Sequence, residues 1–164
     1  MGEENHRASE LLREHGPLLG RVAMALLGES VHVAAALEQV AREVGEDVGR
    51  GVPVVSVRAW LLGKVRVASA GRRSTLGVRS RTPGSDEPAP RTERLGSVEA
   101  RAVRAELGAL RPTEREAVIL SIVGALDPSE VALACNVDIA TARGRIASGL
   151  QQLLRAVNQG GTSR

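Results

Sequence analysis

The stretch DPSEVALACNVDIATARGRIASGLQQLL, residues 127–154, decides the fold. Asp127 and Glu130 bracket a first-turn proline in the pattern of a capping box, which predicts the start of a short helix. Asn136 tolerates the left-handed conformation that ends a helix tightly. Asp138 is a good cap for the next, longer helix. Two capped helices joined by so short a turn predict a helix-turn-helix.

The second helix of this pair carries side chains suited to the major groove of DNA. Its apolar positions repeat at helical spacing, which leaves small, polar and basic residues on the other face. Arginine binds guanine edges or phosphates, threonine bonds either, and alanine can touch a thymine methyl group. The predicted DNA-binding residues are Asp138, Ala140, Thr141, Arg143 and Arg145. A purely structural helix pair would show the same pattern, so that alternative stays open.

Charge is distributed unevenly along the chain, although the net charge is only +3. Residues 58–82 carry basic side chains and no acidic one, and no carboxylate follows Arg143. Two basic stretches separated by acidic ones favour two contacts with a polyanion over a solvated surface. The candidate phosphate contacts of the first stretch are Lys64, Arg66, Arg72 and Arg73.

Helical spacing of apolar residues also runs through the N-terminal half. The pattern predicts helices over about 8–27, from Ser30, and from Ser56 to Gly71, with a glycine-rich loop over 45–53. Trp60 shares an apolar stripe with its neighbours and is expected in the core. The VPVVSV segment has strand propensity, but no partner strand is apparent.

Between the two helical halves lies a stretch rich in Gly, Ser, Thr and Pro with no apolar period. After it we expect a helix from Ser97 and a second one started by a Thr113–Glu116 capping box. The fold class is therefore all-α, with two small helical domains and a flexible linker. The expected boundaries are a helical domain at 1–71, the linker at 72–96, a helix-turn-helix domain at 97–157 and a disordered tail at 158–164.

Residues 110–154 resemble region 4 of the bacterial sigma factors of the extracytoplasmic-function group. The resemblance rests on Leu110, Pro112, the Arg115–Val118 run, Glu130-Val131-Ala132, Asn136-Val137 and Thr141–Ile146, in order and without a gap. It implies that Thr141, Arg143 and Arg145 lie on the helix that reads the −35 promoter element.

The N-terminal half resembles region 2 of the same family, in LLREHGPLLGRVAMALLGES and in VRAWLLGKV. This resemblance implies that residues near Glu38, Gln39 and Arg42 bind core RNA polymerase. Where the family has an acidic Asp-Ala-Glu-Asp, this chain has His32-Val33-Ala34-Ala35, and the loop after the second helix has no aromatic residue. Opening a duplex needs groups that hold an extruded base, and valine and glycine supply little of that.

The sequence supports two functional interpretations and disfavours a third. The preferred reading is a sigma-like protein that binds core RNA polymerase and double-stranded promoter DNA. The alternative is a degenerate sigma-like protein that does not melt promoters and acts through protein interaction, for example by sequestering an anti-sigma factor. A dimeric helix-turn-helix repressor is less favoured because no dimerisation element is left over.

The remaining expectations concern chemistry and location. Cys135 is the single cysteine and the three histidines are scattered, so we expect neither a disulfide nor a metal site nor any cofactor. No nucleophile–base pair or phosphate-binding loop is present, and we expect no enzymatic activity. The polar N-terminus and the lack of a long apolar run predict a cytoplasmic protein without a membrane segment.

Overall fold

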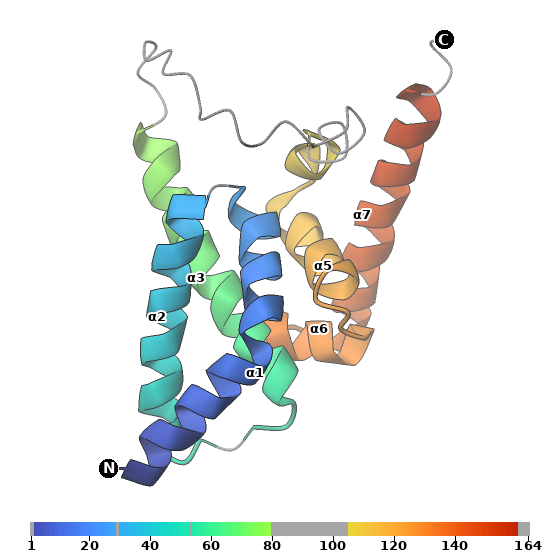
Figure 1. Cartoon of the computed structure of the whole chain (residues 1–164). Coiled ribbons are helices and arrows are strands. Elements are labelled where there is room, and N and C mark those ends of the chain that lie inside the picture. Colours follow the sequence, from blue (N-terminus) through green and yellow to red (C-terminus); the bar gives the residue numbers. More distant parts are fainter. Residues whose placement is uncertain (1, 29, 53, 80–104, 161–164) are drawn as a thin grey trace.

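The computed structural model describes residues 2–28, 30–52, 54–79 and 105–160, and its helices form two groups (Figure 1). The N-terminal group consists of α1 (Gly2–Leu27), α2 (Ser30–Gly49) and α3 (Val57–Arg79). The C-terminal group consists of α5 (Pro112–Ile122), α6 (Pro128–Cys135) and α7 (Ile139–Gly160). Residues 105–109 are helical as well. The described residues contain no strand, which confirms the all-α prediction and leaves VPVVSV as an irregular connection.

The three N-terminal helices pack along one another around an aliphatic core. Val22, Val40, Val44 and Val65 come from all three helices and are fully buried. Gly28 ends α1 with a φ of +78°, a conformation that favours glycine, as the sequence predicted. α1 is one helix in spite of the proline within it.

Two of these helices are longer than the sequence predicted. α2 runs past Gly45 to Gly49, so the loop expected over 45–53 is shorter, and α3 runs past Gly71 to Arg79. Glycine costs an interior helical position about 1 kcal/mol, which the packing of Val48 against the core offsets in α2. The helix expected from Ser97 falls partly on residues 97–104, which lie outside the described part of the chain. Residues 72–79 of the predicted linker and 158–160 of the predicted tail are helical; 80–96 and 161–164 lie outside the described part.

The capping box predicted at Thr113 is wrong. α5 begins two residues earlier than this box requires, at Pro112, with Arg111 as its N-cap and no capping hydrogen bond from the Arg111 side chain. Proline fits the first helical position because its φ is already helical and it has no N–H to satisfy. Glu116 does not reach back to the helix start, since its carboxylate lies 3.3 Å from the guanidinium of Arg66 on α3.

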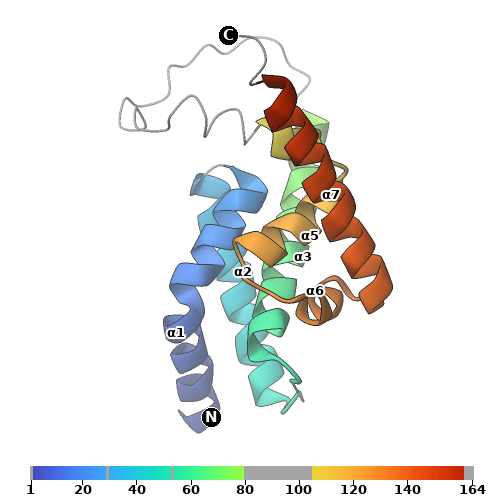
Figure 2. The same cartoon turned by 90° about the vertical axis from the view of Figure 1, so that its right-hand side faces the viewer.

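The two helical groups pack against each other along α3. α6 lies beside α3 and α5 lies beside α1, whereas α7 lies on the outside of the C-terminal group, farthest from α2 (Figures 1 and 2). One continuous apolar core joins both groups and includes Leu62 from α3, Leu120 from α5 and Val131 from α6. No helix among the described residues is long and apolar enough to cross a lipid bilayer.

Candidate nucleic-acid interface

The first helix of the predicted helix-turn-helix starts as its sequence indicates. Asp127 accepts hydrogen bonds from the backbone N–H groups of Ser129 at 2.7 Å and Glu130 at 3.0 Å. Glu130 in turn accepts from the Asp127 N–H at 3.3 Å, which completes the capping box. The predicted box is therefore confirmed, and it fixes where α6 begins.

The turn between α6 and α7 also follows the sequence. Asn136 adopts the left-handed conformation, with φ 53° and ψ 53°, and its N–H bonds to carbonyl groups in the last turn of α6. The Val137 N–H donates to the Ala132 carbonyl at 3.0 Å. Asp138 then caps α7 by accepting from the Thr141 N–H at 2.8 Å and from its hydroxyl at 2.6 Å. These local bonds set the angle at which α7 leaves the turn.

One side of α7 is held against α5 by a close approach and two polar contacts. A Cβ atom at Gly149 would lie 2.6 Å from the Val118 side chain. The lack of a side chain at this position therefore permits the close approach of α7 to α5. Glu114 of α5 is buried and accepts from the Ser148 hydroxyl at 2.8 Å and from the Gln152 amide at 3.1 Å. The Ser148 hydrogen bond is the main reason that the pKa of Glu114 is lowered. This anchoring turns the opposite side of α7 outward.

The predicted DNA-binding residues lie at the outward-facing start of α7. Asp138, Ala140 and Arg143 are exposed, whereas Thr141 and Arg145 are half-buried. Gly144 is exposed too, and a side chain at that position would meet nothing within 4 Å. Small residues beside an exposed arginine permit a close approach to a nucleic-acid groove.

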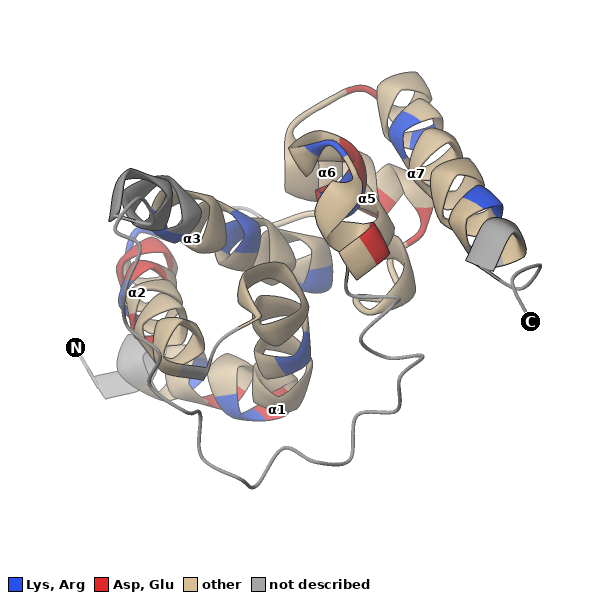
Figure 3. Cartoon of the chain, turned by 90° about the horizontal axis from the view of Figure 1, so that it is seen from above, with Lys and Arg blue, Asp and Glu red and all other residues tan. Residues whose placement is uncertain are grey.

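The arginines of this surface are not neutralised by the rest of the described chain. Neither Arg143 nor Arg145 has an ion pair with a described carboxylate, and α7 contains no acidic residue. Figure 3 shows the outer helix α7 with basic bands and no acidic ones. The start of α7 is therefore a cationic, accessible helix end, which is what contact with a phosphate backbone requires.

Asp138 and Thr141 have a structural role that limits what they can offer DNA. Their side chains bond to each other, and the Thr141 hydroxyl is the main reason that the pKa of Asp138 is lowered. The ionised carboxylate of Asp138 accepts the hydrogen bonds that cap the helix, and its negative charge would repel a phosphate. Ala140, Arg143 and Arg145 are thus the stronger candidates for direct contact.

The basic residues of α3 that were predicted as phosphate contacts have partners within the chain. Lys64 lies 2.7 Å from the Asp47 carboxylate and 5.5 Å from the centre of the Trp60 ring. Arg66 pairs with Glu116, and Arg72 donates to the carbonyl of Ala35 at 2.6 Å. In this conformation the predicted phosphate contacts Lys64, Arg66 and Arg72 are therefore engaged within the chain. The side chain of Arg73 lies outside the described part.

The predicted polymerase-binding residues belong to α2, and this helix lies on the other side of the molecule from α7 (Figures 1 and 3). Glu38 and Arg42 are exposed. Gln39 is half-buried and donates to Glu43 at 2.9 Å. α2 and α7 therefore lie on opposite sides of the molecule, and each carries exposed residues among those predicted.

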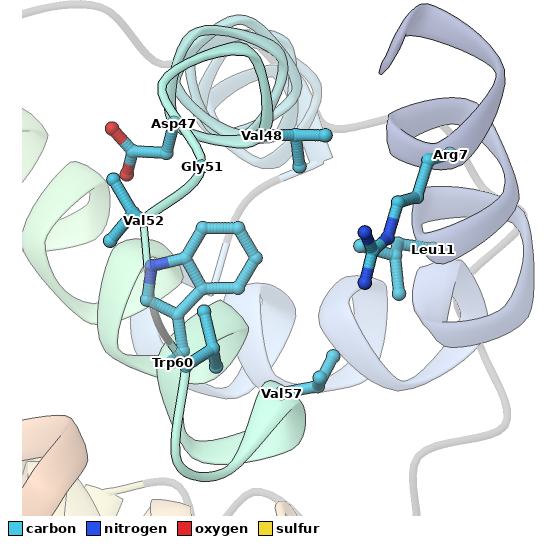
Figure 4. A pocket seen from close by; sticks show the side chains of 9 residues that line it. Arg7, Leu11, Asp47, Val48, Gly51, Val52, Val57 and Trp60 are labelled. Atoms are coloured by element: carbon cyan, nitrogen blue, oxygen red, sulfur yellow. The ribbon is translucent and has the colours of Figure 1, made fainter. Parts of the chain in front are cut away.

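A pocket of about 320 Å³ opens in the N-terminal group, between the start of α1, the end of α2 and the start of α3 (Figure 4). Leu11, Val48 and Trp60 form apolar walls, and Arg7 reaches toward the opening. Asp47 lies at the edge and is already paired with Lys64. Trp60 packs on the core as predicted, with part of its ring lining this pocket.

Several important side chains were not singled out from the sequence. Arg58 donates to the Gly124 carbonyl at 2.5 Å, and Ser56 donates to Glu130 at 2.9 Å, so both join the two helical groups. For Glu116 the sequence pattern predicts only a capping role. The sequence signal for polar contacts between the two groups is their charge. The stretch 58–82 has no acidic residue, and it is followed by a stretch, 83–138, with an excess of acidic residues.

Comparison with known proteins gives structural neighbours only. No family model and no curated protein matches the sequence. The sigma factor RpoE of Bartonella quintana, solved with the anti-sigma factor NepR, is similar with a TM-score of 0.73 and 18% identity, over 95% of this chain and 98% of that one. CnrH, solved with the cytosolic domain of CnrY, is similar with a TM-score of 0.69 and 17% identity, over 93% and 88%. Over nearly its whole length, the chain therefore has the fold of the sigma factor RpoE, in agreement with the family resemblance in its sequence.

Proposed function

We propose that the chain is a sigma-like transcription factor, which binds double-stranded promoter DNA through the start of α7 and core RNA polymerase through α2. The observation that carries the proposal is that Arg143 is exposed, without an ion pair among the described residues, on a helix of the helix-turn-helix that is hydrogen-bonded to α5. The fold shared with RpoE supports the same role. The polymerase would perform the chemistry, and this chain would have no catalytic step of its own.

Substitution of one α7 arginine tests the DNA contact. Arg143→Ala is expected to weaken promoter binding by about 1–3 kcal/mol and to relax sequence preference if the guanidinium meets a base edge. Arg155→Ala is the matched control, because Arg155 is an exposed arginine on the same helix, roughly 18 Å further along its axis. Affinity and footprinting on a selected duplex measure both. Equal effects of the two substitutions would contradict a specific contact at Arg143.

Capture of core polymerase tests the α2 surface. The tagged full chain is expected to retain the core subunits, and Arg42→Glu is expected to reduce that retention at least several-fold by reversing a charge on the exposed face. Arg21→Glu on α1 makes the same change on another exposed arginine and should leave retention unchanged. No retention by the unmodified chain would exclude the polymerase role.

A protein-binding regulator is the second candidate function. Both structural neighbours were solved with another protein, NepR or CnrY. In this chain the connection between α2 and α3 contains no aromatic residue to hold an extruded base. Run-off transcription with reconstituted polymerase distinguishes the two roles. A transcript supports initiation, whereas polymerase binding or DNA binding without a transcript supports the regulator.

A further inference from the structure

The pocket beside Trp60 belongs wholly to the N-terminal helical group. Its lining comes from α1, α2, α3 and the connection between α2 and α3, and no described residue of the C-terminal group takes part. Its volume of about 320 Å³ falls within the range of about 300–1,000 Å³ that is typical of small-molecule sites. Packed helices leave few voids larger than a water molecule between them. This space is therefore a pocket that a small molecule can enter.

The walls of the pocket are apolar. Leu11 of α1 faces the indole of Trp60 across the pocket, and Val48 and Val57 lie between them (Figure 4). Leu11, Val48 and Trp60 are half-buried, and Val57 is 36% exposed. Contact of such groups with water is unfavourable, so an apolar body that displaces the water gains free energy. The flat indole face suits an aromatic ring or an aliphatic chain equally well.

One side of the pocket carries a positive charge that the chain does not neutralise. Arg7 extends from α1 toward the opening beside Leu11 (Figure 4), and it forms no ion pair with any described side chain. The carboxylate of Asp47 at the other edge lies 2.7 Å from the ammonium group of Lys64, whose side chain is only 17% exposed. The negative charge at the pocket is therefore already paired, whereas the guanidinium is not. A guanidinium can bind a carboxylate through two parallel hydrogen bonds.

We propose that this pocket binds a small amphipathic carboxylate, with its apolar body between Trp60 and Leu11 and its carboxylate on Arg7. The volume equals that of roughly ten water molecules, so the ligand has about ten non-hydrogen atoms. A single cationic group matches one carboxylate better than a phosphate, which carries more charge. The site does not depend on the proposed DNA and polymerase contacts. Arg143→Ala should therefore leave ligand binding unchanged.

Fluorescence of the full chain tests the binding directly. Trp60 is the only tryptophan, and the chain has no Tyr or Phe, so its intrinsic emission reports on this pocket wall alone. Titration with 3-phenylpropanoate or octanoate should change that emission saturably and raise the melting temperature. The tighter of the two probes indicates whether the body is aromatic or aliphatic. No saturable change with either probe would overturn the proposal.

Two further probes separate the contributions of body and charge. Acetate carries the carboxylate without an apolar body, and 3-phenylpropanamide has the same shape as 3-phenylpropanoate without the charge. Each should bind about tenfold more weakly than 3-phenylpropanoate, or worse. Equal affinity for acetate or for the amide would contradict the assigned fit.

Substitution of Arg7 tests the charged contact. Arg7→Gln should weaken binding of 3-phenylpropanoate about tenfold and leave the affinity for the amide unchanged, which a merely structural effect would not do. Arg13→Gln is the matched control, because Arg13 is an exposed arginine of the same helix and does not line the pocket. An equal loss in both variants, or no loss in Arg7→Gln, would overturn the role of Arg7.

A larger side chain at Val57 tests the location. Val57→Phe narrows the pocket from the start of α3 and should weaken binding of octanoate several-fold, as measured by calorimetry. Val55→Phe makes the same change two residues earlier, on a side chain that is 91% exposed and outside the lining, and should have no effect. Because Val57 and Arg7 are exposed, both variants should keep the helix content of the unmodified chain by circular dichroism. Unchanged affinity of Val57→Phe would place the ligand elsewhere and overturn the proposal.

Discussion

At the scale of single residues, three carboxylates hold the C-terminal group in shape. Asp127 and Asp138 accept hydrogen bonds at the starts of α6 and α7, and Glu114 accepts from two α7 side chains. The pKa of each is lowered, chiefly by hydrogen bonds from Ser129, Thr141 and Ser148 respectively. These bonds favour the ionised form, so folding and ionisation are linked at all three sites.

That linkage predicts acid sensitivity of the fold. A carboxyl group whose pKa is lower in the folded state than in the unfolded state stabilises the fold. This contribution is fully present above the ordinary pKa values of 3.8 for Asp and 4.5 for Glu. This stability is lost as the pH falls through the lower folded values. The melting temperature, followed by circular dichroism, should therefore fall steadily below about pH 5. Asp138→Asn keeps an oxygen acceptor but does not titrate, and should flatten the profile.

The control for this pH profile is Glu10→Gln, which changes an exposed carboxylate of α1. Its profile should match that of the unmodified chain. A melting temperature that is constant from pH 6 to pH 3 would contradict the assigned role of the three carboxylates.

At the scale of elements, two glycines on α7 have opposite surroundings. Gly149 faces Val118, where a methyl group would come within 2.6 Å, and Gly144 faces open space. Gly144→Ala should stabilise the chain by up to about 1 kcal/mol because alanine is the better helix former. Gly149→Ala gains the same propensity but forces Val118 aside, at a cost of about 1–3 kcal/mol. Urea unfolding should therefore rank Gly144→Ala above Gly149→Ala.

This pair also checks which side of α7 packs on α5. If Gly149→Ala proved as stabilising as Gly144→Ala, the close approach to Val118 would be absent in solution. The outward direction of Arg143, which depends on that packing, would then lose its support.

The elements predicted from sequence are those with local signals. The caps at Asp127 and Asp138, the left-handed Asn136 and the end of α1 at Gly28 depend on residues within a few positions of each other. The predicted ends of α2 and α3 were too early, because glycine lowers helix propensity only slightly and tertiary packing overrides it. The start of α7 could be singled out as a site for the same reason, since its pattern lies in one helix.

At the scale of the whole molecule, the packing of the two groups could not be predicted from helical periodicity. It depends on pairs far apart in sequence, such as Arg66 with Glu116 and Gly63 with Ala134. Interpreting Arg66 as a phosphate contact followed from its charge alone. The position of its partner is a property of the fold, so the sequence could not decide between a phosphate and a carboxylate.

A double-mutant cycle on Arg66 and Glu116 measures whether the two groups are packed together in solution. The side chains are only 22% and 9% exposed, so Arg66→Met or Glu116→Leu alone leaves a poorly solvated charge and should cost about 3 kcal/mol in unfolding free energy. The double variant should cost only about 1 kcal/mol, mainly for the Ala134 carbonyl that loses its donor. The predicted coupling is therefore several kcal/mol. If the groups were apart, each charge would be hydrated, the two effects would add, and the coupling would be close to zero.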